Sequence, residues 1–232
     1  MGAAQPIVGC RGRALGALVK QPMTVHDDNH RMIADYYADQ LRQDGDDGQR
    51  VGWNGATSQH LRFQQVRTVV RDPNQPFSIL DWGCGLGALV GYLDANGYNY
   101  RYTGYDINTT SVEEARARHA GNSRVAAITA ERDSLTEYDF VVSVGIFNYK
   151  GDKPTATWEP YVLSSLATHW AYARLGLAAN FLTAYSDTDR MEDTLYYPQP
   201  ETLFGYAKRA LSRNVALLHD YDLYDCTLIV RR

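Results

Sequence analysis

The stretch that decides the fold is Ile79-Leu80-Asp81-Trp82-Gly83-Cys84-Gly85-Leu86-Gly87-Ala88-Leu89. Apolar residues lead into it as they would in a buried strand, and three glycines at alternate positions then turn the chain. The segment 86–93 continues with the pattern of a helix. Glycine is needed where the backbone bends tightly and comes close to a ligand, and the first N–H groups of the following helix face that ligand. The stretch therefore predicts a nucleotide-binding turn and, with it, a ligand that contains adenosine.

The composition is that of a globular protein of one domain. The chain has 232 residues, of which 44% are hydrophobic and 22% are charged, and its net charge is −4. This charge gives no electrostatic reason to expect nucleic acid or an anionic membrane as a partner, and no apolar run has the length of a membrane span. Three widely spaced cysteines indicate no disulfide framework and a reducing compartment. We therefore expect a cytoplasmic protein that binds small molecules only.

The sequence pattern divides the chain into three parts. Residues 1–22 are expected to form a loose N-terminal arm, residues 23–76 a helical cap, and residues 77–232 the core that carries the glycine turn. The cap is expected to hold two amphipathic helices, which end near Gln43 and Arg71.

Strand-like and helix-like segments alternate along the core. Strands are expected at 77–81, 100–106, 125–129, 138–147 and 177–185, and helices at 86–96, 111–119, 157–175 and 201–212. The chain then ends in two strands, 214–219 and 224–230, joined by a turn short enough for antiparallel pairing. This alternation predicts an α/β fold: a mostly parallel seven-stranded sheet with helices on both faces and an antiparallel last strand, which we place at the edge.

From Phe77 to Arg232, this order of elements resembles the Rossmann-like fold of the class I S-adenosylmethionine (SAM)-dependent methyltransferases. The run 81–87 is similar to the first motif of that superfamily, and Asp106 at the end of the next strand strengthens the resemblance. A dinucleotide-binding enzyme more often shows G-x-G-x-x-G. The third position after Gly85 is Ala88, so an NAD-dependent oxidoreductase is the weaker alternative.

The resemblance implies a set of SAM-binding residues in the core. Asp81 opens the motif, and the backbone of Gly83, Cys84, Gly85 and Gly87 would hold the methionine moiety. Asp106 would accept hydrogen bonds from both ribose hydroxyls, since a carboxylate offers two oxygens to two adjacent donors. The remaining core residues in this set are Ile107 against the adenine, Glu131 near the adenine amine with Asp133 as a competitor, and Gly145 beside the bound molecule.

The cap contributes two further residues to the expected SAM site. Trp53 and Arg62 are similar to a pattern of small-molecule members in which an N-terminal segment closes over the cofactor. An arginine is suited to binding the methionine carboxylate through two nitrogens. The alternative is that Arg62 is a surface residue of an amphipathic helix.

Three residues suggest a specific reaction. Asn148, Tyr185 and Ser212 resemble the constellation of bacterial azetidine-2-carboxylate synthases, which act in natural-product biosynthesis. The resemblance implies that the α-amine of SAM attacks its own Cγ and releases methylthioadenosine. Tyr185 would face the sulfonium by cation–π attraction, with Tyr36, Tyr37, Tyr149 and Tyr221 as possible partners, while Asn148 and Ser212 would orient the amine and the carboxylate.

Other functions remain open at this point. Methyl transfer from SAM to a small-molecule acceptor is the closest competitor, and a non-catalytic SAM-binding module is a third reading. The chain after the fourth strand, 145–150, lacks the Asn/Asp-Pro-Pro-aromatic signature of amino-group methyltransferases on nucleic acids and proteins. His26 and His30 have the spacing of metal ligands on a helix, but no third ligand is evident, so no metal site is predicted.

Overall fold

The computed structural model describes residues 25–42, 44–45, 47–50, 52 and 55–232, so the predicted arm at 1–22 lies outside the described residues. Its strands are β1 (Phe77–Trp82), β2 (Tyr100–Tyr105), β3 (Val125–Thr129), β4 (Tyr138–Val144), β5 (Ala173–Leu182), β6 (Asn214–Leu218) and β7 (Asp225–Arg231). Its helices are α1 (Val25–Leu41), α2 (Asp47–Arg50), α3 (Ala56–Val66), α4 (Ala88–Ala95), α5 (Thr109–His119), α6 (Thr155–Tyr172) and α7 (Pro200–Tyr206).

The seven strands form one sheet in the order β3-β2-β1-β4-β5-β7-β6. The neighbours from β3 to β5 pair in parallel, and β7 pairs antiparallel with both β5 and β6. This confirms the predicted fold class and the antiparallel last strand. The predicted edge position of that strand is wrong, because β7 lies between β5 and β6. Residues 225–230 are all buried, as an interior strand requires, whereas β6 is partly exposed and forms the edge.

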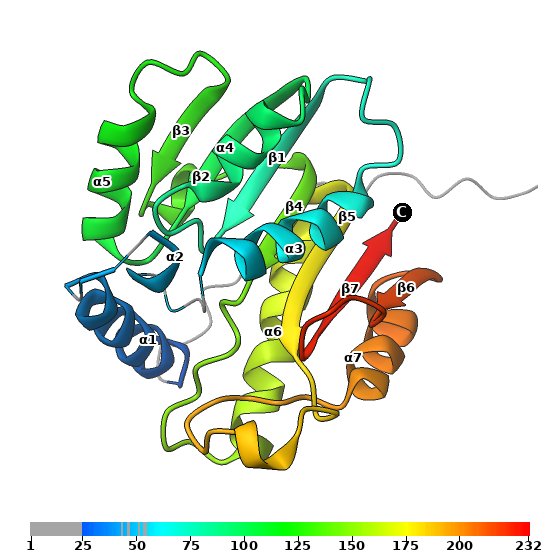
Figure 1. The fold of residues 1–232 in the computed structure, drawn as a ribbon. Helices are drawn as coiled ribbons and strands as arrows, with labels where there is room; N and C mark the ends of the chain where they lie inside the picture. Colours follow the sequence, from blue (N-terminus) through cyan, green and yellow to red (C-terminus); the bar gives the residue numbers. More distant parts are fainter. Residues whose placement is uncertain (1–24, 43, 46, 51, 53–54) are drawn as a thin grey trace, which may run out of the picture.

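Helices cover both faces of the sheet (Figure 1). One core lies between the sheet and helices α3, α4 and α5, and the other lies between the sheet and helices α6 and α7. Successive side chains of a strand point to opposite faces of the sheet, so Ile79 packs in the first core and Leu80 in the second. No helix in the described part of the chain is long and apolar enough to cross a membrane.

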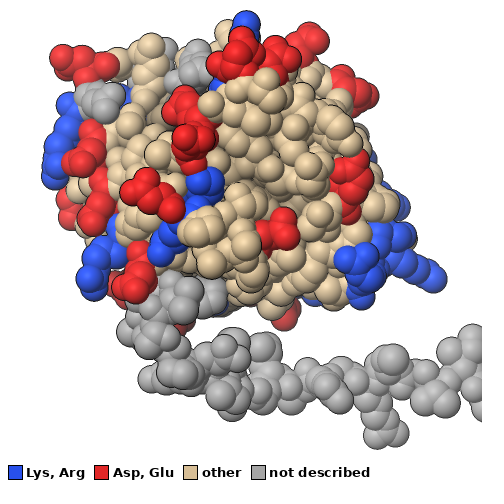
Figure 2. Space-filling view, turned by 90° about the horizontal axis from the view of Figure 1, so that it is seen from below, with Lys and Arg blue, Asp and Glu red and all other residues tan. Residues whose placement is uncertain are grey.

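The first helix lies beside the glycine turn rather than on either face of the sheet. Helix α1 contacts α2 and α5, and Ile33 in its middle packs into the second core. The parallel strands end on the face shown in Figure 2, where acidic and basic side chains are interspersed. Ligands of open α/β sheets bind at this carboxyl edge, so the following section concerns the residues gathered there.

Candidate functional site

The glycine turn has a backbone shape that only glycine adopts without strain. Gly83, Gly85 and Gly87 have φ values of 78°, 51° and 75°. The N–H groups of Gly83 and Cys84 both donate to the carbonyl of Tyr105, at 2.7 and 3.0 Å, and thereby tie the end of β1 to the end of β2. A Cβ atom on Gly83 would lie 2.2 Å from Cγ2 of Ile146, so no larger residue fits there.

Asp106 is fixed at the end of β2 by the turn itself. Its Oδ2 accepts the N–H of Gly85 at 2.8 Å, and its Oδ1 accepts the N–H of Asn108 at 2.9 Å. Burial raises the pKa of the Asp106 carboxyl above its ordinary value, and these two backbone hydrogen bonds oppose that shift. The carboxyl group is thus held in one orientation beside the backbone that a ligand would approach.

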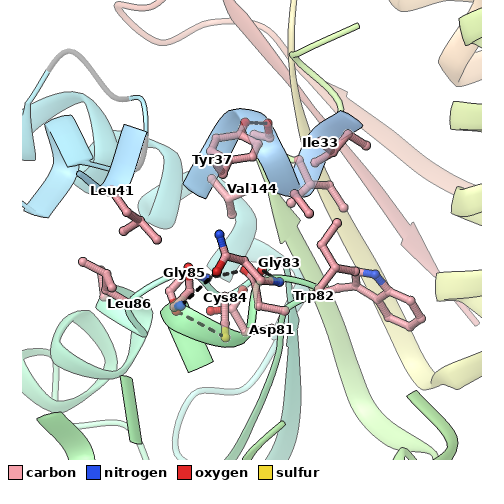
Figure 3. A pocket seen from close by; sticks show the side chains of 18 of the residues that line it. Ile33, Tyr37, Leu41, Asp81, Trp82, Gly83, Cys84, Gly85, Leu86 and Val144 are labelled. Carbon is pink, nitrogen blue, oxygen red and sulfur yellow. Dashed lines mark hydrogen bonds between the residues drawn. The ribbon is translucent and has the colours of Figure 1, made fainter. Parts of the chain in front are cut away.

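A narrow cavity lies between the glycine turn and α1. Figure 3 shows Ile33 and Tyr37 projecting from α1 opposite Asp81, Gly83 and Gly85. The lining further includes His30, Leu41, Phe63, Trp82, Cys84, Leu86, Asp106, Ile107, Asn108, Ser111, Val144, Gly145 and Ile146. Most of these side chains are apolar, so the cavity suits a ligand with a flat apolar part and a few fixed polar groups.

Asn108 supplies a polar group to this cavity that the protein leaves unsatisfied. Its Oδ1 accepts the N–H groups of Thr110 and Ser111 and so caps α5. Its Nδ2 is buried and has no hydrogen-bond partner among the described residues. A buried donor without a partner is costly, so a ligand atom that accepts this hydrogen bond would be stabilised. A ribose oxygen or a ring nitrogen of adenine fits that requirement.

The narrow cavity favours a cation. Asp81 and Asp106 both line it, and no lysine or arginine does among the described residues. Burial raises the pKa of Asp81 to about 7, the hydroxyl of Tyr102 opposes this by donating to Asp81 at 2.9 Å, and the charge of Asp106 adds to the increase. A positively charged ligand would relieve the repulsion between the two carboxyl groups and favour their ionised forms.

A second, wide cavity of about 700 Å³ adjoins the narrow one. Tyr37 and Gly145 line both, and the Tyr37 hydroxyl donates to the Gly145 carbonyl at 3.4 Å. The wide cavity lies among α1, the loop after β4, the loop 186–197 and the turn before β7. Its lining includes Tyr36, Arg62, Asn148, Tyr149, Ser186, Arg190, Glu192, Tyr197, Tyr221, Asp222, Tyr224 and Asp225.

Most of the SAM-binding residues expected from the sequence converge in the structure. The narrow cavity is lined by Asp81, Gly83, Cys84, Gly85, Asp106, Ile107 and Gly145. Gly87 stands next to it and precedes the first residue of α4. Glu131 is exposed and does not line either cavity, so the structure places it away from the others. Trp53 lies outside the described residues.

Arg62 is paired with a carboxylate of the protein itself. Its Nε and Nη2 donate to the two carboxylate oxygens of Asp225, at 2.6 and 3.0 Å, and both side chains are almost fully buried. A buried guanidinium needs a carboxylate, and β7 supplies it from the protein itself. Arg62 lines the wide cavity and not the narrow one, and its binding to the methionine carboxylate stays a prediction.

The three residues proposed for cyclisation do not come together. Asn148 lines the wide cavity. Tyr185 is 62% exposed, because a turn at 183–186 directs it outward, where its hydroxyl donates to Glu201 at 2.6 Å. Ser212 donates to the carbonyl of Arg231, at the opposite edge of the sheet from the glycine turn. The prediction that Ser212 lies at the active-site edge is therefore wrong. Tyr185 follows the carboxyl end of β5, but its exposed side chain lines neither cavity.

Asn108 and Asp225 are among the site residues that sequence reasoning missed. Asn108 could have been found, because an asparagine followed by Thr109 and Thr110 is a typical helix N-cap immediately after a strand. Asp225 carried no local signal, since its partner Arg62 is 163 positions away. The side chain of His26 lies outside the described residues, and His30 lines the narrow cavity with its ring 6.1 Å from that of Tyr161.

Comparisons with known proteins agree with this geometry. A family model described as a methyltransferase domain matches residues 80–166, which include the glycine turn. Rv1506c of Mycobacterium tuberculosis, whose methyltransferase name is provisional, is 43% identical over 157 residues, covering 68% of this chain and 94% of that protein. The cyclopropane-fatty-acyl-phospholipid synthase of Escherichia coli K12 is 32% identical over 80 residues, covering 34% of this chain and 21% of the synthase.

Solved structures show the same fold. Magnesium protoporphyrin IX methyltransferase (ChlM) from Synechocystis PCC 6803 with bound SAM superposes with a TM-score of 0.61 at 18% identity, over 91% of this chain and all of that chain. The same enzyme with bound SAH gives a TM-score of 0.62 at 17% identity, over 88% of this chain and all of that chain. The fold, the family model and the relative at 43% identity together place this chain in the class I SAM-dependent methyltransferase superfamily.

Proposed function

We propose that this protein binds SAM in the narrow cavity and transfers its methyl group to a small-molecule acceptor. The observation that carries the proposal is the pairing of a left-handed glycine turn with two carboxyl groups, Asp81 and Asp106, in a cavity that no lysine or arginine lines among the described residues. SAM carries a net positive charge at neutral pH, and its sulfonium supplies an activated methyl group when bound.

The residues present fit this ligand. The backbone of Gly83–Gly85 can lie against the methionine part because it bears no obstructing side chain except that of Cys84. Asp106 can accept from the ribose hydroxyls, and the unsatisfied Nδ2 of Asn108 can donate to the nucleoside. Ile107 offers an apolar wall for the adenine. NAD fits poorly, since its pyrophosphate would bring negative charge beside Asp81 and Asp106.

Cyclisation of SAM is the less supported reaction, because Tyr185 and Ser212 lie away from the cavity. Methyl transfer agrees better with the separate wide cavity that adjoins the first, which offers room for an acceptor. We further propose that the acceptor is neither nucleic acid nor membrane, in line with the net charge of −4.

Calorimetry followed by product analysis tests the proposal. SAM and S-adenosylhomocysteine are expected to bind, and NAD is not. Incubation with SAM and a pool of small acceptors should then yield S-adenosylhomocysteine, whereas SAM alone should yield no methylthioadenosine. Methylthioadenosine without an acceptor would establish cyclisation instead. SAM binding with neither product from any acceptor would favour a non-catalytic module, and the absence of SAM binding would overturn the proposal.

A further inference from the structure

The boundary between the two cavities is formed by a single side chain and a stretch of backbone. Among the described residues, Tyr37 and Gly145 line both cavities, and the Tyr37 hydroxyl donates to the Gly145 carbonyl across that boundary. Gly145 has a φ of 73° and is buried, so the backbone there brings no Cβ into the passage. Any group that passes from the narrow cavity to the wide one must therefore pass beside Tyr37.

Tyr37 packs against a neighbouring ring, and burial keeps its phenol neutral. The Tyr36 ring meets the Tyr37 ring edge to face at 5.1 Å, and Tyr36 itself stacks on Tyr149 at 3.6 Å. Burial raises the pKa of the Tyr37 phenol well above its ordinary value, and the charge of nearby Asp106 adds to the increase. The group at the boundary is thus a neutral aromatic ring, which attracts a cation through its face and does not act as a base at neutral pH.

We propose that the sulfonium methyl group lies at this boundary in contact with Tyr37, and that the wide cavity holds the acceptor. This inference rests on the proposed function. A lone pair of the acceptor forms the new bond to the methyl carbon, the bond from that carbon to sulfur breaks, and its electron pair stays on the sulfur. The acceptor's proton passes to solvent at the exposed rim of the wide cavity, where Glu192 and Asp222 lie.

The wide cavity also indicates the chemical class of the acceptor. Among the described residues, three carboxylates and two guanidinium groups line it, and one of each, Asp225 and Arg62, forms an ion pair. In the described part of the lining, the charges that remain are Glu192, Asp222 and Arg190, so these residues offer an anionic acceptor no excess of positive charge. Six tyrosines in the lining supply flat faces and hydroxyl groups. These features fit an uncharged molecule with several hydroxyl groups, such as a phenol or a glycoside.

The contact between Tyr37 and the methyl group is tested by NMR with SAM labelled with ¹³C at the methyl carbon. In the complex with the natural protein, the ring current should move the methyl resonance away from its position in free SAM. Tyr37→Phe should keep that displacement, and Tyr37→Leu should remove most of it while SAM still binds. Tyr197→Leu is the matched control, because Tyr197 lines only the wide cavity, and it should keep the displacement.

A nuclear Overhauser contact between the methyl protons and a tyrosine ring, measured on the natural protein, gives the same information without a variant. If SAM binds but Tyr37→Leu and Tyr197→Leu leave the same methyl resonance, or no ring contact is observed, the inference fails while the proposed function stands. If SAM does not bind at all, the proposed function fails first.

The acceptor class is tested on the complex with S-adenosylhomocysteine by saturation-transfer NMR. The probes are pairs of phenols and pairs of glycosides, one member of each pair neutral and the other phosphorylated. Transfer to neutral members is expected, and the two kinds of pair distinguish a phenolic from a sugar acceptor. Preference for the phosphorylated members, or no transfer to any probe, would overturn the assignment of the class.

Discussion

At the scale of single residues, the glycine turn depends on residues that have no Cβ atom. Gly83 combines a left-handed backbone with a site where a Cβ would lie 2.2 Å from Ile146. We expect Gly83→Ala to lower the free energy of unfolding by about 1–3 kcal/mol from backbone strain, with a further loss from the collision. SAM affinity should fall more than tenfold, because the backbone that faces the ligand must move. Calorimetry and denaturant unfolding measure the two effects.

Gly91 provides the matched control for that substitution. It lies inside α4, and a Cβ there would meet no atom within 4 Å. Gly91→Ala is expected to raise the free energy of unfolding by about 0.5–1 kcal/mol, since alanine loses less backbone entropy in a helix. SAM affinity should not change. Equal losses of affinity in the two variants would contradict the role assigned to the turn.

The two carboxyl groups of the narrow cavity make the protein sensitive to pH. The pKa of Asp81 is about 7 in the folded chain without ligand, above its ordinary value of 3.8. The folded state then binds more protons than the unfolded state between these values, so this group's stabilising contribution is complete below pH 3.8 and is lost as pH rises through 7. For a pKa shift of this size, the free energy of unfolding that this group contributes below pH 3.8 and loses above pH 7 is roughly 4 kcal/mol.

We therefore predict that Asp81→Asn is more stable than the natural protein at pH 8 and that the advantage disappears toward pH 4. The affinity for a cationic ligand such as SAM should change with pH in the opposite direction to the stability, because the ligand favours the ionised carboxylate. SAM affinity of the natural protein should rise from pH 6 to pH 8 more steeply than the SAM affinity of Asp81→Asn. The variant lacks the Asp81 carboxyl group, so its profile shows the effect of titrating SAM itself. Parallel affinity profiles of the two proteins would contradict the predicted contact.

At the scale of elements, the ion pair between Arg62 and Asp225 links α3 to the start of β7. Both side chains are almost fully buried, and the Nδ2 of Asn180 also donates to Asp225 at 3.0 Å. We expect Arg62→Met or Asp225→Asn alone to lower the free energy of unfolding by about 3–5 kcal/mol, since each leaves a buried charge without its partner. The double variant should lose less than the sum of the two, as denaturant unfolding of the four proteins would show.

The same variants separate the two roles considered for Arg62. SAM affinity of folded Arg62→Met should stay within about threefold of the natural value, since Arg62 lines only the wide cavity. A loss of SAM binding by a hundredfold or more, with the fold intact, would instead restore the role expected from the sequence. Calorimetry under conditions where circular dichroism shows a folded protein makes the distinction.

How far the sequence predicts each element depends on whether the signal is local. The strand at Val125–Thr129 was predicted at its observed bounds, and β1 and β2 to within one residue, because apolar runs bounded by turn residues mark them. The strand predicted at 177–185 begins four residues late and ends three residues late relative to β5, since its turn at Thr183 has no proline or glycine. The neighbours of β7 and the partner of Arg62 were not predictable, because register between distant strands leaves no local mark.

The candidate site follows the same division. Asp81 and the glycines form one short motif, and Asp106 ends the next strand. The structure brings these residues to one cavity, because the two strands are neighbours in the sheet. Tyr185 and Ser212 were chosen because they stand at the ends of predicted elements. That criterion is insufficient, because the turn at 183–186 directs Tyr185 outward. Ser212 binds Arg231 at the end of antiparallel β7, on the opposite edge of the sheet from the glycine turn.

At the scale of the whole molecule, the distribution of charge limits the partners. The net charge is −4, and both signs are interspersed on the face that carries the site (Figure 2). Non-specific binding to DNA or RNA depends on clustered lysine and arginine. We expect no binding to a labelled DNA duplex or to transfer RNA at about 0.1 M salt by fluorescence anisotropy, where surface charges act over only ~10 Å. Saturable binding under these conditions would contradict the small-molecule assignment.

The position of α1 couples the N-terminal helices to the ligand. Helix α1 contributes His30, Ile33, Tyr37 and Leu41 to the narrow cavity. Its packing against other helices is light: it contacts α2 and α5, and the His30 ring lies 6.1 Å from that of Tyr161 in α6. A helix with few packed neighbours opens more readily than the central strands. A ligand that fills the space beneath it adds contacts available only when it is closed, so binding stabilises the closed form.

Hydrogen exchange measures this coupling directly. In the protein without ligand, amides of α1 should exchange faster than those of β1 and β4. S-adenosylhomocysteine should slow exchange in α1 and in the turn 83–87, because both face the same bound molecule. Strand β6 lies at the opposite edge of the sheet and serves as the internal control, with no change expected. Equal protection of β6 and α1 would indicate a uniform gain in stability, and protection of the turn without α1 would show that this helix does not close on the ligand.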